Sequence, residues 1–445
     1  MTPTISPLLT DLYELNMVQA YLDRDENREA VFEFFVRRLP ARRGFLMAAG
    51  LDTALDYLEN VQFSPEDIDW LAKTGRFKKN LLDYLGNFRF TGDVHAMPEG
   101  TAFFPHEPIL RITAPLAQAQ LVETRLINIL HFQSMIASKA ARMVLAANGK
   151  TLVDFGLRSA HGAEAGLMSA RASYIAGFAG AANIQAGQLF GIPIYGTMAH
   201  SYVQVHEDEA AAFENFARAR PDNLVLLIDT YDTEAGVRKV VALGPKLKEI
   251  GATLRSVRID SGDLAEMARK VRRILDDGGM KDVTIFVSGG VNEDVLMAMQ
   301  KSGAPIDGFG IGANLDTSQD APTLDCAYKL QEYDGTPRRK LSEGKQTWPG
   351  RKQVWRNYAP DGAMDGDTLS VESDKQAGEQ LIAQVMKGGK RIAPPPALAA
   401  VRDHAACELR RLPKLLQQLD AAAYPVTVSE KLTALAAQAD ARTRR

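Results

Sequence analysis

Residues 224–314 read LVLLIDTYDTEAGVRKVVALGPKLKEIGATLRSVRIDSGDLAEMARKVRRILDDGGMKDVTIFVSGGVNEDVLMAMQKSGAPIDGFGIGAN. Short apolar runs bounded by Gly, Ser, Asp and Asn alternate here with longer amphipathic segments, a pattern typical of β-loop-α units. Two more apolar runs precede this stretch, so six strands are predicted, at residues 151–155, 192–196, 224–229, 253–259, 283–287 and 306–311. Repeated units of this kind need right-handed parallel connections, and their closed or nearly closed form is a (β/α) barrel.

Every predicted strand runs into polar or glycine-rich residues. Examples are Asp154-Phe155-Gly156-Leu157-Arg158 after the first strand, Arg258-Ile259-Asp260-Ser261-Gly262-Asp263 in and after the fourth, and Ser288-Gly289-Gly290 after the fifth. Because the carboxyl ends of parallel strands meet at one rim, where barrel enzymes carry their active sites, we expect these residues to lie together.

The rest of the chain divides by pattern into flanking regions. Residues 1–112 mix helical and strand patterns and predict an N-terminal α+β domain, residues 113–330 the α/β barrel, and residues 331–445 a C-terminal basic loop and helical region. The fold class is therefore α/β, an irregular (β/α) barrel with an N-terminal α+β domain and a C-terminal segment packing on it. Helices are predicted at residues 8–21, 115–147, 207–219, 235–250, 264–276 and 293–301.

Composition excludes several classes of protein. A length of 445 residues suggests about three structural units, and a net charge of −3 gives no argument for a nucleic-acid or membrane partner. Cys326 and Cys407 cannot form a disulfide framework or a zinc ribbon, and the acidic N-terminal region does not resemble a signal peptide, so a cytoplasmic location is expected. The uncharged stretch 172–206 contains Asn, Gln and Pro and is better explained as protein interior than as a membrane span.

The rim residues predict phosphate chemistry. The glycine-rich turns after the fifth and sixth strands suit a phosphate, because their backbone N–H groups are free of side-chain bulk. The pairs Asp229/Asp232 and Asp260/Asp263 could hold Mg²⁺ on a pyrophosphate, bind ribose hydroxyls or stabilise a developing cation. At least one member of each pair is alternatively a helix N-cap, with Asp232 and Asp263 as the candidates.

A histidine, two arginines and a phenylalanine complete the candidate site. His200 follows the second predicted strand among small and hydroxyl residues, where a neutral imidazole can act as a nucleophile if a carboxylate fixes its tautomer. Guanidinium groups at Arg158 and Arg258 match carboxylate or phosphate geometry, and Phe155 beside Arg158 offers an apolar face to a planar anionic substrate. Structural roles, such as surface salt bridges or a structural histidine, are the alternatives for each.

Together with these rim segments, further motifs in collinear order resemble nicotinate phosphoribosyltransferases over nearly the whole chain. They are Thr10-Asp11-Leu12-Tyr13-Glu14-Leu15, Glu99-Gly100-Thr101 with Phe104-Pro105-x-Glu107-Pro108, Glu123-Thr124-x-x-x-Asn128-Ile129-Leu130 and Gly196-Thr197-Met198-Ala199-His200-Ser201.

The resemblance implies an enzyme that joins nicotinate to 5-phosphoribosyl 1-pyrophosphate, giving nicotinate mononucleotide and pyrophosphate in NAD salvage. It further implies an ATP-dependent ligase that uses ATP as co-substrate and Mg²⁺ as cofactor, and a homodimer whose partner subunits complete each other's active sites. His200 matches the histidine that ATP phosphorylates, and Phe155 with Tyr13 of the neighbouring subunit matches the aromatic pair around the pyridine ring.

The remaining matched positions are substrate-site residues: Arg158, Ser201, Asp229, Arg258, Asp260, Ser288, Gly289, Gly290, Gly310 and Gly312. Of these, His200, Asp229, Asp260 and Arg258 are the catalytic candidates. Mg²⁺ would bind through the substrate pyrophosphate, with Asp229 and Asp260 as candidate ligands. Ala313-Asn314 departs from the Thr that many relatives carry after the GxG, which leaves open whether a hydroxyl contact to phosphate is missing or replaced by backbone.

Three alternatives are distinguishable. A nicotinamide phosphoribosyltransferase would turn over nicotinamide instead of nicotinate, and a sugar-phosphate lyase or isomerase would use a Lys or Glu base and no ATP. A catalytically silent RNA-binding scaffold would use the basic segment Pro337–Asn357, and its affinity would fall steeply with salt.

Overall fold

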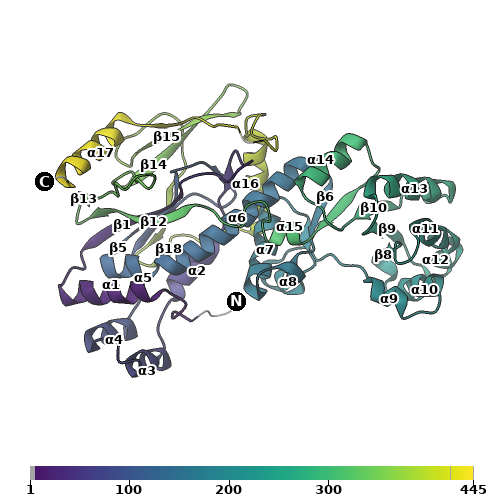
Figure 1. The fold of residues 1–445 in the computed structure, drawn as a ribbon, viewed down its shortest axis with the longest axis horizontal. Helices are drawn as coiled ribbons and strands as arrows, with labels where there is room; N and C mark the ends of the chain where they lie inside the picture. Colours follow the sequence, from purple (N-terminus) through teal and green to yellow (C-terminus); the bar gives the residue numbers. More distant parts are fainter. Residues whose placement is uncertain (1–5, 421, 444–445) are drawn as a thin grey trace. The chain divides into compact units, whose positions relative to one another are not determined.

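The computed structural model describes residues 6–420 and 422–443, which group into two compact units (Figure 1). Met1–Ser138 and Ala321–Arg445 form the first unit, and Lys139–Asp320 the second. The outer ends of the predicted domains, at residues 1 and 445, lie outside the described residues. The predicted domain boundaries at 112 and 330 stay predictions.

The second unit is built on a six-stranded parallel sheet, which confirms the predicted α/β fold. The strand order is β7-β6-β11-β10-β9-β8, and the sheet curls into a half-barrel. The strands are β6 Thr151–Asp154, β7 Gly180–Ala181, β8 Leu224–Leu227, β9 Leu254–Ile259, β10 Thr284–Val287 and β11 Gly308–Ile311. All of them are short and apolar because both faces of a parallel sheet are covered.

One predicted strand is wrong. Residues 192–196 make only an isolated parallel bridge, between Ile194 and Ala181, and the edge strand of the sheet is β7, which the apolar pattern missed. Pro193 has no N–H to donate to a ladder, and the side chains of Ile194 and Tyr195 are exposed. The apolar residues at 192–196 therefore do not form a buried strand of this sheet.

Helices cover this sheet and begin where the sequence supplies caps. Asp232 and Asp263 accept hydrogen bonds from the first-turn backbone of α11 and α13, which confirms the N-cap interpretation for both. The single helix predicted at 235–250 is two helices, since Gly244-Pro245 interrupts it. The helices are α7 Ala163–Ala176, α8 Ile184–Phe190, α9 His200–Gln204, α10 Glu209–Ala219, α11 Thr233–Ala242, α12 Gly244–Ile250, α13 Leu264–Asp277, α14 Glu293–Ser302, α15 Ala313–Asp316, and the 3₁₀ turns η1 Leu157–Ser159 and η2 Pro221–Asn223.

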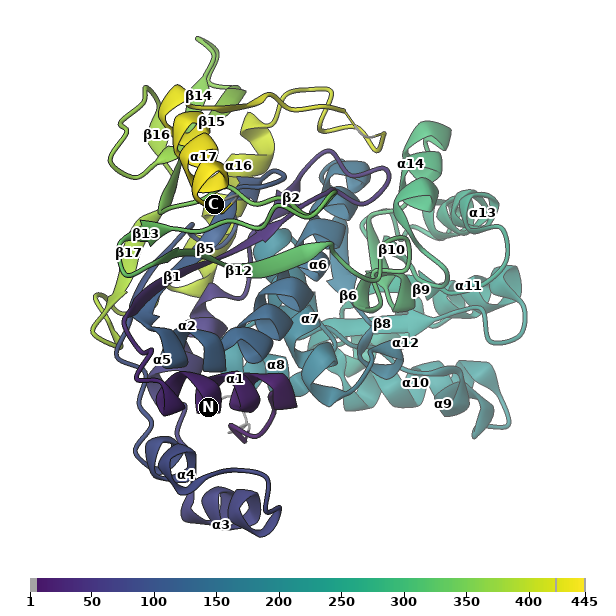
Figure 2. The same cartoon turned by 60° about the vertical axis from the view of Figure 1, so that its left-hand side comes forward.

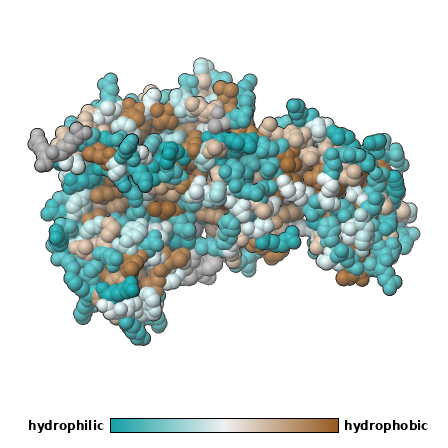
Figure 3. All heavy atoms as spheres, viewed as in Figure 1, coloured by the Kyte–Doolittle hydropathy of each residue, from teal (hydrophilic) through white to brown (hydrophobic). Residues whose placement is uncertain are grey.

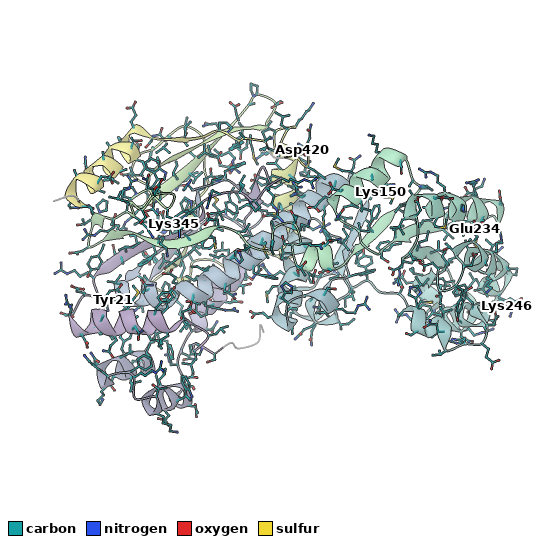
Figure 4. All side chains as sticks on the ribbon, in the orientation of Figure 1. Tyr21, Lys150, Glu234, Lys246, Lys345 and Asp420 are labelled. Carbon is teal, nitrogen blue, oxygen red and sulfur yellow. The ribbon has the colours of Figure 1, made fainter. Side chains whose placement is uncertain are left out.

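Helices α10 to α13 lie on the outer side of β8 and β9 (Figure 1). Their outward surface is mainly hydrophilic (Figure 3), and Glu234 on α11 and Lys246 on α12 project from it (Figure 4). Both side chains make ion pairs with neighbouring helices, Glu234 with Lys270 at 3.1 Å and Lys246 with Glu214 at 2.5 Å. This face is a solvated surface.

The first unit joins the two ends of the chain. In its seven-stranded sheet, of order β13-β12-β1-β5-β3-β17-β18, the C-terminal strand β12 pairs with the N-terminal strand β1. These strands are β1 Glu29–Val36, β3 Asp93–Ala96, β5 Pro108–Pro115, β12 Cys326–Tyr333, β13 Thr336–Pro337, β17 Ala383–Lys387 and β18 Lys390–Arg391. A smaller sheet of order β16-β14-β15-β19 contains β14 Lys352–Tyr358, β15 Met364–Val371, β16 Glu379–Gln380 and β19 Val426–Val428, and β2 Leu46–Met47 pairs with β4 Ala102–Phe103.

Helices of this unit surround those sheets (Figure 2). They are α1 Leu12–Asp23, α2 Leu51–Asn60, α3 Pro65–Lys73, α4 Lys79–Gly86, α5 Leu116–Leu121, α16 Leu398–Arg411 and α17 Glu430–Thr443, and the long α6 Glu123–Ala147 supplies residues to both units. The helix predicted at 115–147 is therefore α5 followed by α6. The short helices α3 and α4 pack on each other, and α4 packs on α1.

Two cations of the basic segment Pro337–Asn357 are used internally, whereas Arg338, Lys340 and Lys345 are exposed. Lys352 is 1% exposed and its Nζ lies 2.7 Å from Glu33, while the fully buried Arg356 bonds Asp367 and Glu408. Buried cations that are paired in this way stabilise the packing of β14 and are not available to a polyanion. The observation removes these two cations from the RNA-binding alternative.

Within the described residues, no helix is both long enough and apolar enough to cross a membrane.

Candidate active site

The parallel strands of the second unit bring the predicted rim residues together. Asp229 follows β8, Arg258 lies near the end of β9 with Asp260 just beyond it, and Ser288 follows β10. Because β8, β9 and β10 are neighbours in the sheet, residues distant in sequence become adjacent at its carboxyl edge.

Asp229 organises the loop after β9. Its Oδ2 accepts hydrogen bonds from the Asp260 backbone N–H at 2.8 Å and from the Ser261 hydroxyl at 2.7 Å. Its other oxygen is buried and meets no hydrogen-bond partner among the described residues. One oxygen thus fixes the neighbouring loop.

Asp260 stands between a serine and the histidine. Its Oδ1 accepts a short hydrogen bond from the Ser288 hydroxyl, and its Oδ2 lies 3.9 Å from Nε2 of His200. About a third of each side chain is exposed, at 37% for Asp260 and 40% for His200. This carboxylate is close enough to influence the orientation of the His200 ring, and it is exposed enough to contact a ligand.

His200 is the first residue of α9, and a hydroxyl group contacts its other ring nitrogen. Nδ1 lies 3.2 Å from Oγ1 of Thr230. With Nδ1 next to the hydroxyl and Nε2 facing Asp260, the imidazole has a defined orientation. That is what nucleophilic use of a histidine requires.

Arg258 lies between the acidic residues and a threonine. Its Nη1 donates to Oγ1 of Thr197 at 2.6 Å, and its Nε is buried without a hydrogen-bond partner among the described residues. Burial lowers the pKa of Arg258 from its ordinary value, and Asp260 and Asp229 oppose that shift. The guanidinium therefore has donor capacity left for an anion.

Phe155 packs on Gly310 of β11. Its ring centroid lies 5.9 Å from that of Phe286, and a Cβ built on Gly310 would lie 2.4 Å from the Phe155 ring. Only glycine at 310 leaves room for this ring position. Phe155 is half-buried, so part of the ring stays open.

The two glycine-rich turns are tied to each other. Gly289 and Gly290 have positive φ angles of 90° and 65°, and Asn314 donates from Nδ2 to the carbonyls of Gly290 at 3.2 Å and Val291 at 2.9 Å. The side chain after the GxG therefore acts as a link between the two turns. Asn314 thus has a structural role, and the question of the phosphate contact at Ala313 stays open.

The other predicted site residues are placed as follows. Arg158 lies on η1 and is exposed, Ser201 is exposed on α9, and Gly312 precedes α15. Tyr13 lies on α1 of the first unit with 45% of its side chain exposed. Its neighbour Glu14 is fully buried.

Sequence reasoning missed three hydroxyl residues that the fold brings to the site. Thr197, Thr230 and Ser261 contact Arg258, His200 and Asp229 respectively. They lie inside the strand-end motifs, but a threonine or serine in a loop carries no signal of its partner. The contacts join separate segments of the chain and arise only in the folded unit.

Comparisons with known proteins agree over most of the chain. Three sequence-family models match in order: nicotinate phosphoribosyltransferase N-terminal domain at residues 8–131, nicotinate phosphoribosyltransferase family at 151–336, and nicotinate phosphoribosyltransferase C-terminal domain at 375–436.

Relatives with the same designation are similar along most of their length. A protein of Mycobacterium tuberculosis H37Rv named nicotinate phosphoribosyltransferase pncB2 is 46% identical over 96% of this chain and 92% of its own. A nicotinate phosphoribosyltransferase of Bacillus subtilis 168 is 40% identical over 84% of this chain and 77% of its own.

Solved structures share the fold. The crystal structure of human nicotinic acid phosphoribosyltransferase superposes with a TM-score of 0.87 at 29% identity, covering 97% of this chain and 99% of the human one. A nicotinate-nucleotide pyrophosphorylase from Pyrococcus furiosus superposes with a TM-score of 0.74 at 25% identity, covering 92% and 98%.

Proposed function

This chain belongs to the nicotinate phosphoribosyltransferase family and is a nicotinate phosphoribosyltransferase, and from that premise we propose that it couples nicotinate mononucleotide synthesis to ATP through a phosphohistidine at His200. The reaction joins nicotinate to 5-phosphoribosyl 1-pyrophosphate and releases pyrophosphate, a step of NAD salvage. The proposal places the enzyme in the ATP-dependent ligase class.

The displacement of pyrophosphate from the ribose needs carboxylates and cations, and both kinds of group lie at the rim. Loss of pyrophosphate from the anomeric carbon develops positive charge on the sugar, which nearby carboxylates stabilise, and negative charge on the leaving group, which cations and backbone N–H groups stabilise. Asp229 and Asp260 are the carboxylates and Arg258 is the cation. The turns at Gly289-Gly290 and Gly310-x-Gly312 are the proposed phosphate cradle.

Phe155 is the proposed pyridine platform. Its ring is held by Gly310 and Phe286 and keeps an open part, while Arg158 supplies a guanidinium three residues along for the nicotinate carboxylate. Because a carboxylate, and not a carboxamide, matches a guanidinium fork, this arrangement favours nicotinate over nicotinamide.

The phosphohistidine step uses Nε2 of His200, because Nδ1 is engaged by Thr230 whereas Nε2 lies 3.9 Å from Asp260, beyond hydrogen-bond distance. The γ-phosphoryl group passes from ATP to the imidazole, which forms an N–P bond as ADP leaves, and water later releases phosphate. Asp260 beside Nε2 and Thr230 beside Nδ1 orient the ring for this transfer. The phosphoryl group adds about −1.5 to −2 charges beside Arg258, which changes the electrostatics of the sugar-pyrophosphate site.

The carboxylate oxygens of this site are suitable ligands for Mg²⁺. Within the described residues no group of three or more His, Cys, Asp or Glu side chains could hold a metal alone, so the ion would take most of its ligands from pyrophosphate oxygens and water. Asp229, with its unpartnered buried oxygen, and Asp260 are the protein groups that would hold it. When bound, the ion offsets the charge of the leaving group.

The proposed active form is a cytoplasmic homodimer in which Tyr13 of one subunit covers the pyridine site of the other. Tyr13 leaves nearly half of its side chain exposed, which suits a contact made in an assembly.

The contact between His200 and Asp260, in the rim cluster, is the observation that carries the ATP proposal. Its test is turnover of labelled nicotinate with 5-phosphoribosyl 1-pyrophosphate and Mg²⁺, with and without ATP. ATP should raise mononucleotide formation, and His200→Ala should abolish that rise while keeping slow, uncoupled synthesis. Equal wild-type rates with and without ATP would contradict the coupling, and preferential turnover of nicotinamide would favour the sister activity.

A further inference from the structure

Two buried acids meet directly behind the substrate-facing loops. Asp154, the last residue of β6, is 3% exposed, and Asp316, the last residue of α15, is 1% exposed. They are far apart in sequence and come from neighbouring segments, because β6 pairs with β11 and β11 leads into α15.

The two carboxyl groups enclose Gly156. Oδ1 of Asp154 accepts a hydrogen bond from the Gly156 backbone N–H at 2.7 Å. A Cβ built on Gly156 would lie 2.1 Å from Oδ1 of Asp316, so the Asp316 carboxyl group packs against the Gly156 backbone where any side chain would stand. One acid thus holds the turn by its N–H, and the other packs on its Cα.

Few polar groups besides these acids reach the pair. Both oxygens of Asp316 are buried without a hydrogen bond of normal geometry to any described residue, and Ser169 on α7 is the hydroxyl that acts on this carboxyl group. The elements packed against α15 carry the charged residues Arg158 on η1 and Glu164 and Arg171 on α7, and the groups that shift the pKa of Asp316 are Asp154 and Ser169.

Two charged carboxylates at such a place would repel each other with little solvent screening. Burial, and then Asp154, raises the pKa of Asp316 to about 9, and burial raises the pKa of Asp154 to about 6. At neutral pH the pair therefore carries one proton, mainly on Asp316.

We propose that Asp154 and Asp316 are positioning residues that share one proton and lock the turn carrying Phe155 and Arg158 onto the loop carrying Gly310 and Gly312. The inference rests on the proposed roles of these four residues in substrate binding. Neither acid touches substrate. The pair acts by fixing the spacing between the pyridine platform and the phosphate cradle, which Phe155 N–H donating to the Ile311 carbonyl at 2.7 Å also sets.

The sign of the pH dependence follows from the raised pKa. The folded protein binds this proton more tightly than the unfolded chain, whose aspartate has the ordinary value of 3.8. The contribution to stability is therefore complete below about pH 4 and is lost as pH rises through about 9. Above that pH both acids are charged, and their repulsion weakens the contact between the turn and the loop.

The test compares Asp316→Asn with Asp316→Ala. Asparagine keeps the donor and the shape of a protonated acid, whereas alanine removes the contact with Gly156. The nicotinate KM of Asp316→Asn should stay within about threefold of wild type at pH 7, and that of Asp316→Ala should rise tenfold or more with a smaller change in kcat. Between pH 7 and 9.5 the wild-type nicotinate KM should rise relative to that of Asp316→Asn.

Thermal unfolding from pH 6 to 9 supplies a readout independent of turnover. As pH rises, the Tm of wild type should fall relative to the Tm of Asp316→Asn. A Tm difference that does not change with pH would overturn the shared proton. The expected Tm behaviour together with unchanged nicotinate KM in Asp316→Ala would overturn the positioning role. Both readouts can be taken without ATP, so failure of the ATP coupling is detected separately.

Discussion

Each reactive residue at the rim of the second unit is held by a neighbour from another segment of the chain. Asp260 takes the Ser288 hydroxyl and faces His200, and Arg258 is held by Thr197. Such support matters because groups that stabilise a developing charge are effective only when they are already oriented.

We expect Asp260→Asn and Arg258→Ala each to lower kcat/KM by tens-fold or more, on the order of 2 to 4 kcal/mol of transition-state stabilisation. Steady-state kinetics at saturating nicotinate measure this, with Asp263→Asn as the matched control. Asp263 is a neighbouring aspartate whose side chain caps α13, and asparagine caps a helix about as well as aspartate, so its substitution should leave both stability and kcat/KM nearly unchanged. Wild-type kinetics in both test variants would contradict the assignment.

At the scale of elements, the site depends on close packing between β6 and β11. Gly310→Ala would place a methyl group 2.4 Å from the Phe155 ring, so the ring must move. We expect a nicotinate KM raised several-fold with a smaller effect on the KM for 5-phosphoribosyl 1-pyrophosphate.

A double-mutant cycle checks the cause. In a Phe155→Ala background the methyl group meets no Phe155 ring, so Gly310→Ala should add little to the nicotinate KM. Fully additive effects would show that the two residues act independently.

Sequence reasoning succeeded where strand ends carry the signal. The alternation of apolar runs located five of the six predicted strands, and the polar residues after β8, β9 and β10 do meet at one edge. It was wrong at 192–196, because an apolar run does not reveal that Pro193 interrupts hydrogen bonding.

Contacts between segments that are distant in sequence could not be predicted from the sequence. Asp316 was not singled out, since nothing local to α15 indicates that its carboxyl group packs on Gly156. Asn314 was noted only as a departure from a pattern, and its bonds to Gly290 and Val291 depend on two strands being adjacent.

For the whole molecule, the division of site residues between the two units leads to a prediction about assembly. Tyr13 belongs to the first unit and His200 to the second. If Tyr13 covers the partner's pyridine site, Tyr13→Ala should raise the nicotinate KM several-fold, because an aromatic stack contributes about 0.5 to 1.5 kcal/mol beyond area burial. Tyr13→Phe, which keeps the ring, is the matched control.

Mixing the variants tests whether the site is shared. Tyr13→Ala and His200→Ala chains, each impaired alone, should regain part of the ATP-coupled activity after subunit exchange, because one of the two sites then receives both intact residues. No gain in a mixture with confirmed exchange would assign Tyr13 to its own chain or to a structural role.

The central claim is that His200 carries the phosphoryl group. Incubation with γ-labelled ATP should give wild-type protein an acid-labile, base-stable label, and peptide mapping should place it in the segment that contains His200. His200→Ala should take up no label, while Asp260→Asn should be labelled more slowly because its side chain orients the ring less well. Equal labelling of wild type and His200→Ala would contradict the account.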